Sequence, residues 1–555
     1  MGLNLRKDGC YMKWFRLRTI GFTISLSLVA GLIGFARPTQ AEDWLKLIGD
    51  VEENLRRWEI TPAYTLVSQA LEKEPRNPQL LSLLAKIYFL QGKYTQSLEA
   101  LNKITEKTPP LDQQIEGFRN FVKALEELTR SFKEYESPHF ILRLDPKVDQ
   151  ILVGYALDTL EKAYEKIGKE FQYFPEEKIL VEVYPDAESF NVASSLSKRD
   201  IEVSGAIAIT KFNKIVLASP WTLVRGYRWM DTLTHEYVHY VIVKTSYNNA
   251  PIWLHEGTAK YHEKLWKDVK GNYLTPFSED LLARALDTNA LIGFQQMEPS
   301  LVKLSSQEEV QLAFVEVASA VEYIVTTGGP GVLAKVMDIL KTEVPASDAV
   351  SKALGQSYEA FEKGWKEFLK QKNLKKTPGL EGENFKIKGP NPEEEELFEE
   401  IESFQAREQI KRGDDFRKLG RKQAAILEYQ RALRSVPNSP FILNKLALTY
   451  MELGNLDKAK QQLEKALEVN PNYVTTYTNL GDLYLIQGDY ARAVENYLES
   501  NQINPFNPAI HKNMGIAYYK LNNPDRAVSE WKNALILDPT DMSVIQFLEQ
   551  AKTSP

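Results

Sequence analysis

His235 and His239 stand four residues apart, and Glu236 follows the first of them directly. Residues four apart lie on the same face of an α-helix, so both imidazoles can reach one metal ion. Zinc binds histidine nitrogens at about 2.0–2.1 Å, and a catalytic zinc keeps one position open for water. The metal lowers the pKa of that water towards about 7, and Glu236 can serve as its general base. The spacing therefore predicts a hydrolytic zinc site.

A third protein ligand must come from outside this pattern. The chain has 6 histidines, and four of them lie between residues 235 and 262. His255, Glu256 and His262 are the nearest alternatives. His255 and Glu256 are neighbours and point about 100° apart around a helix, which favours one of the two and not both.

The segment Pro251 to Ala259, which reads PIWLHEGTA, follows twelve residues after His239. A metzincin would need glycine and histidine at the positions of Ile242 and Thr245, which excludes that family. Together with His-Glu-x-x-His, the segment resembles the second-helix motif of the gluzincin metallopeptidases. The closest resemblance is to the thermolysin-like peptidase MA-like domain, and it extends over about residues 135–369.

This resemblance implies a bound Zn²⁺ and the hydrolysis of peptide bonds in a protein or peptide substrate. It implies that His235, His239 and Glu256 bind the metal and that Glu236 is the base. His255 and His262 then lie near the metal or at the surface without binding it.

Two supporting groups of such a site are less clear in the sequence. The thermolysin pattern has an aspartate shortly after the ligand glutamate, but Lys260 stands four residues on. Asp231, one turn before His235, is an alternative partner, although a helix-surface charge is the competing interpretation. An oxyanion donor is also expected, and Tyr261 and Tyr323 are the catalytic candidates. Each of these tyrosines also fits a position in the core or in the cleft wall.

The elements that would position this site begin with strands and continue with helices. Strands are expected at 139–144, 178–184, 204–210 and 214–218, with helices at 147–171 and from about 225 to about 371. This order favours an α+β domain. The run Ser204 to Thr210 resembles the edge strand that pairs with extended substrates in such peptidases, and an ordinary strand is the alternative.

Prolines mark internal repeats in the C-terminal part of the chain. Pro437, Pro471, Pro505 and Pro539 recur every 34 residues, with small and aromatic residues at fixed positions between them. This pattern resembles tetratricopeptide repeats, which implies helical pairs that bind protein partners. Residues 75–109 show the same 34-residue spacing near the N-terminus.

The first residues have the order of a secretory signal. Basic residues up to Arg18 precede an apolar run from Ile20 to Phe35, and Thr39 to Ala41 resembles a cleavage site. Export to the periplasm or the extracellular space is expected, and an uncleaved membrane anchor is the alternative. The single cysteine, Cys10, falls in this segment. A net charge of −7 gives no basic field for nucleic acid.

We therefore predict a multidomain, mainly α protein. An α+β gluzincin-like metallopeptidase domain is flanked by α-helical tetratricopeptide repeats that form an α-solenoid. The expected boundaries are 1–41 for the signal, 42–134 for an N-terminal helical region, 135–371 for the metallopeptidase, 372–400 for a linker and 401–555 for about four repeats and a capping helix. The alternative function is a repeat-based adaptor whose peptidase-like domain is inactive.

Overall fold

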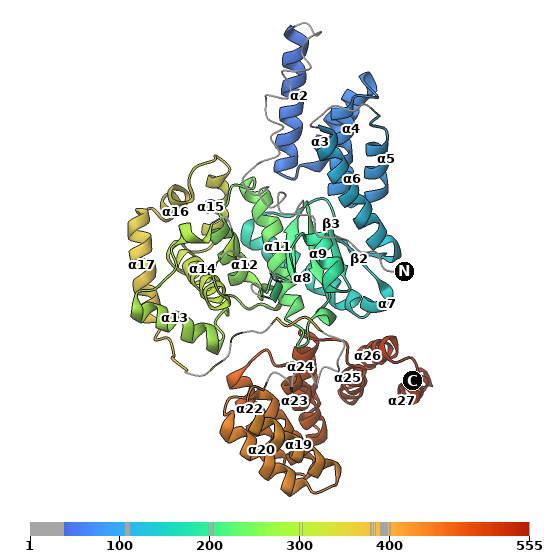
Figure 1. Ribbon diagram of the computed structural model, residues 1–555, viewed down its shortest axis with the longest axis vertical. Coiled ribbons are helices and arrows are strands. Elements are labelled where there is room, and N and C mark those ends of the chain that lie inside the picture. The colour runs from blue at the N-terminus through green and yellow to red at the C-terminus, as the bar shows by residue number, and fades with distance from the viewer. Residues whose placement is uncertain are drawn as a thin grey trace.

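The computed structural model places three parts along the chain, with the central domain between two helical parts (Figure 1). It describes residues 38–553 except 106–110, 198, 200, 203–204, 299, 302–303, 378–379, 381, 383–384, 389–397 and 399–400. Most of the predicted signal, residues 1–37, lies outside the described residues. The predicted fold class is confirmed, because an α+β domain lies between helical repeats.

The N-terminal part consists of successive helices. They are α2 (Pro38–Arg56), α3 (Ile60–Lys73), α4 (Pro78–Leu90), α5 (Tyr94–Asn102) and α6 (Leu111–Leu128). The start of α4 follows from its sequence, since the Asn77 side chain accepts hydrogen bonds from two backbone N–H groups of the first turn. Small residues bring α4 and α5 together, and the Ser97 hydroxyl donates to the Ala85 carbonyl at 2.7 Å.

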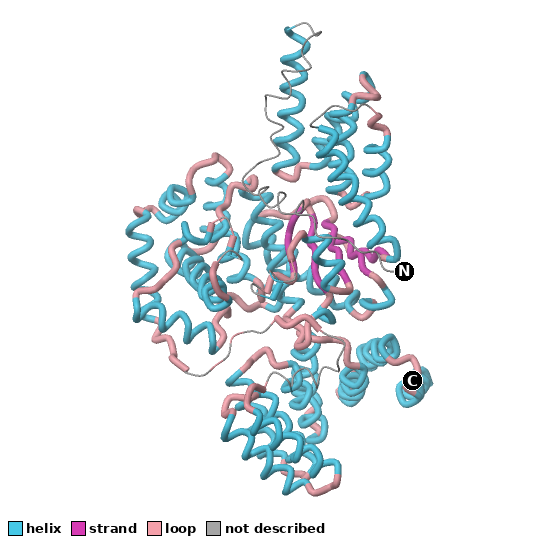
Figure 2. The backbone as a smooth tube through the Cα atoms, viewed as in Figure 1, coloured by secondary structure: helices cyan, strands magenta, loops and turns pink. Residues whose placement is uncertain are grey.

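The central domain contains one five-stranded sheet (Figure 2). Its strands are β1 (Lys133–Glu136), β2 (Phe140–Leu144), β3 (Ile179–Tyr184), β4 (Ala208–Lys211) and β5 (Lys214–Ala218). The order is β1-β2-β3-β5-β4, with β2, β3 and β5 parallel and the outer strands antiparallel. Val181 at the centre lies opposite Leu142 on one side and Ile215 on the other.

Two strands differ from the expectation. Strand β1 was not expected, because its residues KEYE are polar and mostly exposed and show no apolar alternation. The strand expected at 204–210 is shorter and shifted, since β4 covers Ala208–Lys211. Ser204 itself lies outside the described residues.

Helices pack against this sheet and then continue beyond it. α7 (Pro146–Asp149) and α8 (Leu152–Phe171) link β2 to β3, and α9 (Ala187–Ser194) follows β3. The later helices are α11 (Trp229–Ser246), α12 (Ile252–His262), α13 (Pro276–Thr288), α14 (Gln307–Gly328), α15 (Val332–Leu340), α16 (Ala346–Leu354) and α17 (Tyr358–Gln371).

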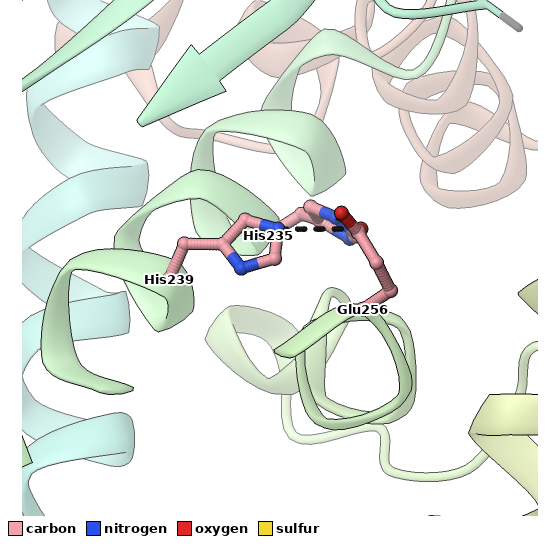
Figure 3. Close-up of side chains that lie close together, drawn as sticks. All are labelled: His235, His239 and Glu256. Carbon is pink, nitrogen blue, oxygen red and sulfur yellow. Dashed lines mark ion pairs between the residues drawn. The ribbon is translucent and has the colours of Figure 1, made fainter. Parts of the chain in front are cut away.

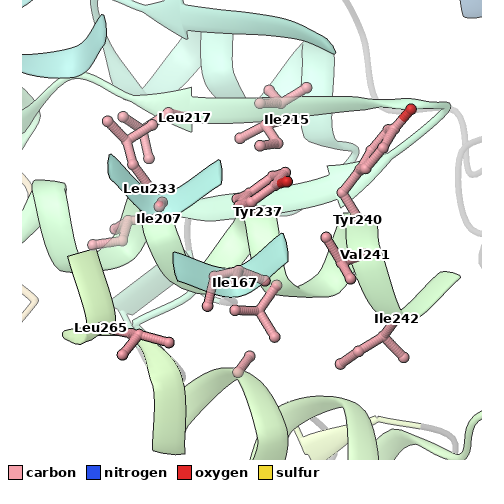
Figure 4. Close-up of a cluster of buried hydrophobic side chains, with 14 of the residues drawn as sticks. Ile167, Ile207, Ile215, Leu217, Leu233, Tyr237, Tyr240, Val241, Ile242 and Leu265 are labelled. Atoms are coloured by element: carbon pink, nitrogen blue, oxygen red, sulfur yellow. The ribbon is translucent and has the colours of Figure 1, made fainter. Parts of the chain in front are cut away.

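Helix α11 runs through the middle of this domain and is buried along most of its length. Leu233, Tyr237 and Val241 lie in a cluster with residues from α8 and β5 (Figure 4). Helix α14 is long and apolar enough to cross a membrane by composition, but more than half of its apolar window is buried within the domain. It is therefore a core helix that supports α12.

The C-terminal part consists of four helical pairs and a final helix, as the repeat spacing predicts. The pairs are α19 (Phe404–Lys418) with α20 (Lys422–Ser435), α21 (Pro440–Glu452) with α22 (Leu456–Val469), α23 (Val474–Gln487) with α24 (Tyr490–Asn501), and α25 (Pro508–Lys520) with α26 (Pro524–Leu537). The final helix is α27 (Met542–Thr553).

In three of these pairs, a glycine of the first helix lies against an aromatic ring of the second helix, so the two helices approach closely. A Cβ atom added at Gly413, Gly481 or Gly515 would lie within 2.4 Å of the ring of Tyr429, Tyr497 or Trp531. The alternation of small and aromatic residues in the sequence therefore reflects close helix contact.

The described part of the expected linker contacts the peptidase domain. The Val224 N–H donates to the Lys386 carbonyl at 3.1 Å, and the Lys388 N–H donates to the Thr222 carbonyl at 2.8 Å. Residues 386–388 are therefore paired with the segment that precedes α11, and do not form a free spacer.

Glu316 on α14 provides a test of the packing around that helix. It is fully buried, and the Ile292 N–H donates to its carboxylate at 3.0 Å. Burial raises the pKa of Glu316 from 4.5 to about 8. The folded chain therefore binds one more proton than the unfolded chain between these values. The free energy of unfolding should fall as pH rises through this window, by about 1.4 kcal/mol per unit.

We expect Glu316→Gln to raise the thermal midpoint more at pH 8 than at pH 5, because the amide needs no proton. Thermal unfolding at both pH values measures this difference. Glu308→Gln, at an exposed position of the same helix, is the control and should show no such pH dependence. An equal shift at both pH values would contradict the raised pKa.

Candidate metal centre

Two adjacent helices bring the predicted ligands together (Figure 3). The Nε2 atoms of His235 and His239, on α11, each lie 3.4 Å from Oε2 of Glu256, on α12. The ligand atoms of the three residues all lie within 4.8 Å of one another. The side chains of the two histidines are 13% and 12% exposed, so the cluster is largely shielded from water.

This spacing is compatible with a tetrahedral zinc ion. Bonds of about 2.0–2.1 Å at tetrahedral angles place neighbouring ligand atoms about 3.3–3.4 Å apart. Both nitrogen–oxygen distances match that value. Two imidazoles and one carboxylate are also a donor set that zinc accepts in catalytic sites.

Ionic interactions shift the pKa values of these groups. Burial alone would lower the pKa of His235, but the carboxylates of Glu256 and Glu263 raise it to about 9. Burial would raise the pKa of Glu256, but His239 and His235 hold it well below its usual range. Glu256 is thus a carboxylate beside a protonated His235, and a divalent cation that binds here would displace the His235 proton.

Glu263 provides the carboxylate that the sequence analysis did not find. Its Oε2 lies 3.6 Å from Nδ1 of His235, the ring nitrogen that faces away from Glu256. Lys260 pairs with the other oxygen of Glu263 at 2.9 Å. Ligand histidines usually donate their second N–H to such a group. Glu263 follows Glu256 by seven residues, about two helical turns, and this spacing is the signal that could have identified it.

Asp231 is neither the partner of a ligand histidine nor a surface charge, so both interpretations of it were wrong. It is buried, accepts a hydrogen bond from the Trp266 indole at 2.8 Å and lies 3.5 Å from the Lys267 ammonium. It therefore connects the first turn of α11 to the segment after α12.

The two other histidines of the window lie outside the ligand set. Nδ1 of His255 is 3.3 Å from Nδ1 of His239, the ring nitrogen of His239 that does not face Glu256. His262 is fully buried and its Nδ1 is 2.7 Å from the Thr258 carbonyl. Its ring packs on Phe171 of α8, which makes it a core residue.

The structure does not bring the two candidate tyrosines to the metal cluster. The Tyr323 ring packs on Phe361 and Phe368 of α17. The Tyr261 ring lies over Gly271. Neither residue is among the described residues that line the cavity around the cluster.

Thr210 on β4 orients Glu236. The Thr210 Oγ1 atom lies 2.7 Å from Oε2 of Glu236 and 2.7 Å from its backbone carbonyl. Glu236 is only 5% exposed, so this contact fixes a buried carboxylate next to the metal cluster. The sequence placed Thr210 in a strand but gave no indication of this contact, because the two residues belong to different elements.

The residue after Glu256 is a glycine, Gly257, and helix α14 leaves no room for a side chain there. A Cβ atom at this position would lie 2.4 Å from the Val317 carbonyl oxygen of α14. Helix α12 therefore approaches α14 closely at the residue after Glu256. A side chain at position 257 would therefore displace the helix that carries Glu256.

The C-terminal repeats complete the N-terminus of α11, which has no side-chain cap. The Trp229 N–H donates to the Gln502 carbonyl at 3.1 Å, and the Tyr227 N–H donates to the Ile503 carbonyl at 3.2 Å. The Trp229 indole donates to the Asn501 carbonyl at 2.9 Å. The carbonyl groups at and just after the end of α24 thus accept the backbone N–H and the indole N–H of Trp229, the first residue of the helix that bears the histidines, and one N–H of the segment before it.

Arg228, directly before α11, strengthens this contact. Its guanidinium lies 2.8 Å from the Glu499 carboxylate and donates to the Asn472 side-chain oxygen at 2.7 Å. It is 17% exposed in its side chain, so these bonds are largely shielded from water.

One cavity of about 2540 Å³ opens onto the metal cluster. All three parts of the chain contribute to its wall. The N-terminal helices contribute residues such as Trp58, Phe118 and Phe121, and the C-terminal repeats contribute Asn472, Tyr477 and Glu499. Both repeat regions therefore form part of the wall of the cavity that contains the cluster.

Comparison with known families agrees with this organisation. Residues 161–371 match the model of the Peptidase MA superfamily. Tetratricopeptide repeat models match residues 62–118, 413–454, 439–503 and 508–541. The chain therefore combines a Peptidase MA superfamily domain with tetratricopeptide repeats on both sides of it, and the predicted combination is confirmed.

Comparison with the curated proteins gives no match. Similar solved structures include a crystal structure of MamA protein, with 22% identity over 26% of this chain and 80% of that chain and a TM-score of 0.25. A thermophilic TPR protein in Thermus thermophilus is similar at 24% identity over 26% of this chain and 80% of that chain, with a TM-score of 0.24.

We expect Glu263→Gln to weaken zinc binding by about 10–100-fold, because an amide cannot match the carboxylate beside His235. Titration against a chelator of known zinc affinity measures this change. Asp231→Asn also removes a buried carboxylate near α11 and is the control. It should lower the thermal midpoint and leave zinc affinity unchanged. Equal losses of zinc affinity in both variants would mean that removing any buried carboxylate near α11 has this effect. Glu263 would then have no specific role beside His235.

We expect Gly257→Ala to cost about 1–3 kcal/mol of stability and to weaken zinc binding, because its methyl group pushes α12 away from α14. Urea unfolding and the same zinc titration measure both effects. Gly154→Ala in α8 is the matched control, since no atom lies within 4 Å of its Cβ position. The control should be neutral or stabilising by about 0.5–1 kcal/mol. Unchanged zinc binding in Gly257→Ala would argue against its spacing role.

Proposed function

We propose that this protein is a zinc-dependent metallopeptidase that hydrolyses peptide bonds. The observation that supports this most directly is the pair of 3.4 Å distances from Glu256 to the two histidines, with Glu236 beside them. A zinc ion bound there would supply Lewis acidity and make water nucleophilic at neutral pH. His235, His239 and Glu256 would hold it.

The residues of the chain have separate tasks in this reaction. Glu236 takes the proton of the attacking water and passes it to the leaving amine, which is the role of a general base and then a general acid. Thr210 holds the Glu236 carboxylate in place through its hydroxyl. Glu263 and His255 orient the two ligand imidazoles from behind.

The main alternative is an adaptor that uses its repeats to bind proteins and does not hydrolyse them. Tetratricopeptide repeats support protein–protein interaction in either case. We favour the enzyme, because His235, Glu236, His239 and Glu256 are all present, and a domain that had lost hydrolysis would not need to keep the complete set.

We also propose that the protein is exported to the periplasm or the extracellular space. This proposal depends on the sequence of the N-terminal segment, most of which lies outside the described residues. The expected cleavage after Ala41 falls in the first turn of α2, so the mature chain would begin within that helix. If the segment is not cleaved, it would anchor the protein to the membrane.

We expect Glu236→Gln to lower kcat for an unfolded protein such as casein by about 10²–10⁴-fold, because the amide cannot accept the proton. Zinc content, measured on the purified full chain, should stay near one equivalent. Glu298→Gln removes a carboxylate from the same cavity wall but keeps an oxygen for the Ile252 N–H, and it should retain activity. Equal activity of Glu236→Gln and the unsubstituted protein would refute the role of the base, and a chain that takes up no zinc would refute the ligands.

A further inference from the structure

The hairpin of β4 and β5 has an unusual turn. Phe212 and Asn213 connect the two strands, and both have positive φ angles of 58° and 59°. Two-residue hairpin turns of this kind prefer asparagine and glycine. A bulky aromatic residue with positive φ is uncommon and costs conformational energy, so contacts of its ring must compensate for it.

Those contacts come from the N-terminal repeats. The Phe212 ring centroid lies 5.0 Å from that of Phe89 on α4 and 6.3 Å from that of Phe121 on α6. Phe118 joins the group through Phe89, at 5.4 Å. We call these four residues the phenylalanine cluster. All four line the cavity of the metal site, and only Phe89 is buried, so the other rings keep surface that faces the cavity.

The phenylalanine cluster is continuous with the metal site through β4. Thr210, which binds Glu236, stands two residues before Phe212. Strand residues are spaced by about 3.3 Å, so the cluster begins about 7 Å from the base along the strand. A substrate residue about two positions from the cleaved bond would lie beside it.

The backbone of β4 can hold such a substrate in an extended form. In the described part of the chain β4 is the edge strand. The Ala218 N–H donates to the Ile207 carbonyl, and hydrogen-bonded pairs alternate along an antiparallel ladder. The backbone groups of Ala208 and Thr210 therefore point away from β5, towards the free edge. Their spacing suits a polypeptide that adds as a further strand.

We propose that the N-terminal repeats form part of the substrate site, and that the phenylalanine cluster binds a large apolar side chain of an extended polypeptide lying along β4. The cavity exceeds the roughly 300–1,000 Å³ of small-molecule sites, which favours a chain segment as the occupant. The identity of the occupant as a peptidase substrate rests on the proposed function. The subsite itself rests on the aromatic contacts and on the edge of β4, with which no described strand pairs.

A binding experiment with the zinc-loaded full chain tests this subsite. The Glu236→Gln background prevents cleavage. The probes are two fluorescein-labelled decapeptides of serine and lysine, with either phenylalanine or asparagine at two central alternate positions. We expect fluorescence anisotropy to show at least tenfold tighter binding of the phenylalanine peptide, as is usual for a large apolar side chain in an apolar pocket.

Phe121→Ala should reduce this preference about tenfold, because it removes a wall of the subsite. Phe132→Ala is the matched control: its ring packs on Tyr184 and does not line the cavity, so the preference should persist. Phe121→Trp fills the subsite without removing core contacts, and should weaken only the phenylalanine peptide. This second variant keeps the test valid if Phe121→Ala fails to fold.

No preference in the parent protein, or an unchanged preference in both Phe121 variants, would overturn the subsite. These outcomes are distinct from failure of the proposed function. If Glu236→Gln cleaves casein as well as the unsubstituted protein but Phe121→Ala loses the preference, the subsite stands and the catalytic role of Glu236 falls. If cleavage depends on Glu236 but the phenylalanine peptide binds no more tightly than the asparagine peptide, the catalytic role of Glu236 stands and the subsite falls.

Discussion

The central domain must stabilise ionisable side chains on a helix that is buried along most of its length. His235, Glu236 and His239 all lie on α11, whose other residues form the core. Buried charge is costly unless it is paired, so each of the three side chains needs a partner on a different element. Glu256 comes from α12, Thr210 from β4 and Glu263 from the end of α12. The elements packed around α11 therefore supply the partners that the side chains of His235, Glu236 and His239 need.

The two repeat regions are part of this arrangement and not separate modules. The end of α24 provides carbonyl groups for the uncapped start of α11, and Arg228 binds Glu499 beside it. On the opposite side, rings of α4 and α6 hold the turn of the hairpin whose strand carries Thr210. Helix α11 and the edge strand β4 thus each contact a different repeat region.

The sequence indicates that His235, His239 and Glu256 can lie together, because this grouping depends largely on local spacing. A separation of four positions places His235 and His239 on one helical face, and the 34-residue proline spacing identifies the C-terminal repeats. Contacts between distant elements leave no such pattern. Glu263, Thr210 and Gln502 were missed for this reason, and Asp231 was misjudged because burial depends on Trp266 and Lys267. Tyr261 and Tyr323 were chosen by residue type alone, and packing places both away from the cavity.

The cap on α11 has a consequence for biosynthesis. Trp229 and Asn501, which are bonded to each other, are separated by 272 residues. A ribosome makes the N-terminal repeats, the sheet and the helices that carry His235, His239 and Glu256 before it makes residues 501–503. During this time the backbone N–H and the indole N–H of Trp229 lack the Gln502 and Asn501 carbonyls to which they donate. The contacts at the start of the histidine helix are completed only by the last quarter of the chain, so a nascent or truncated molecule has the helix without them.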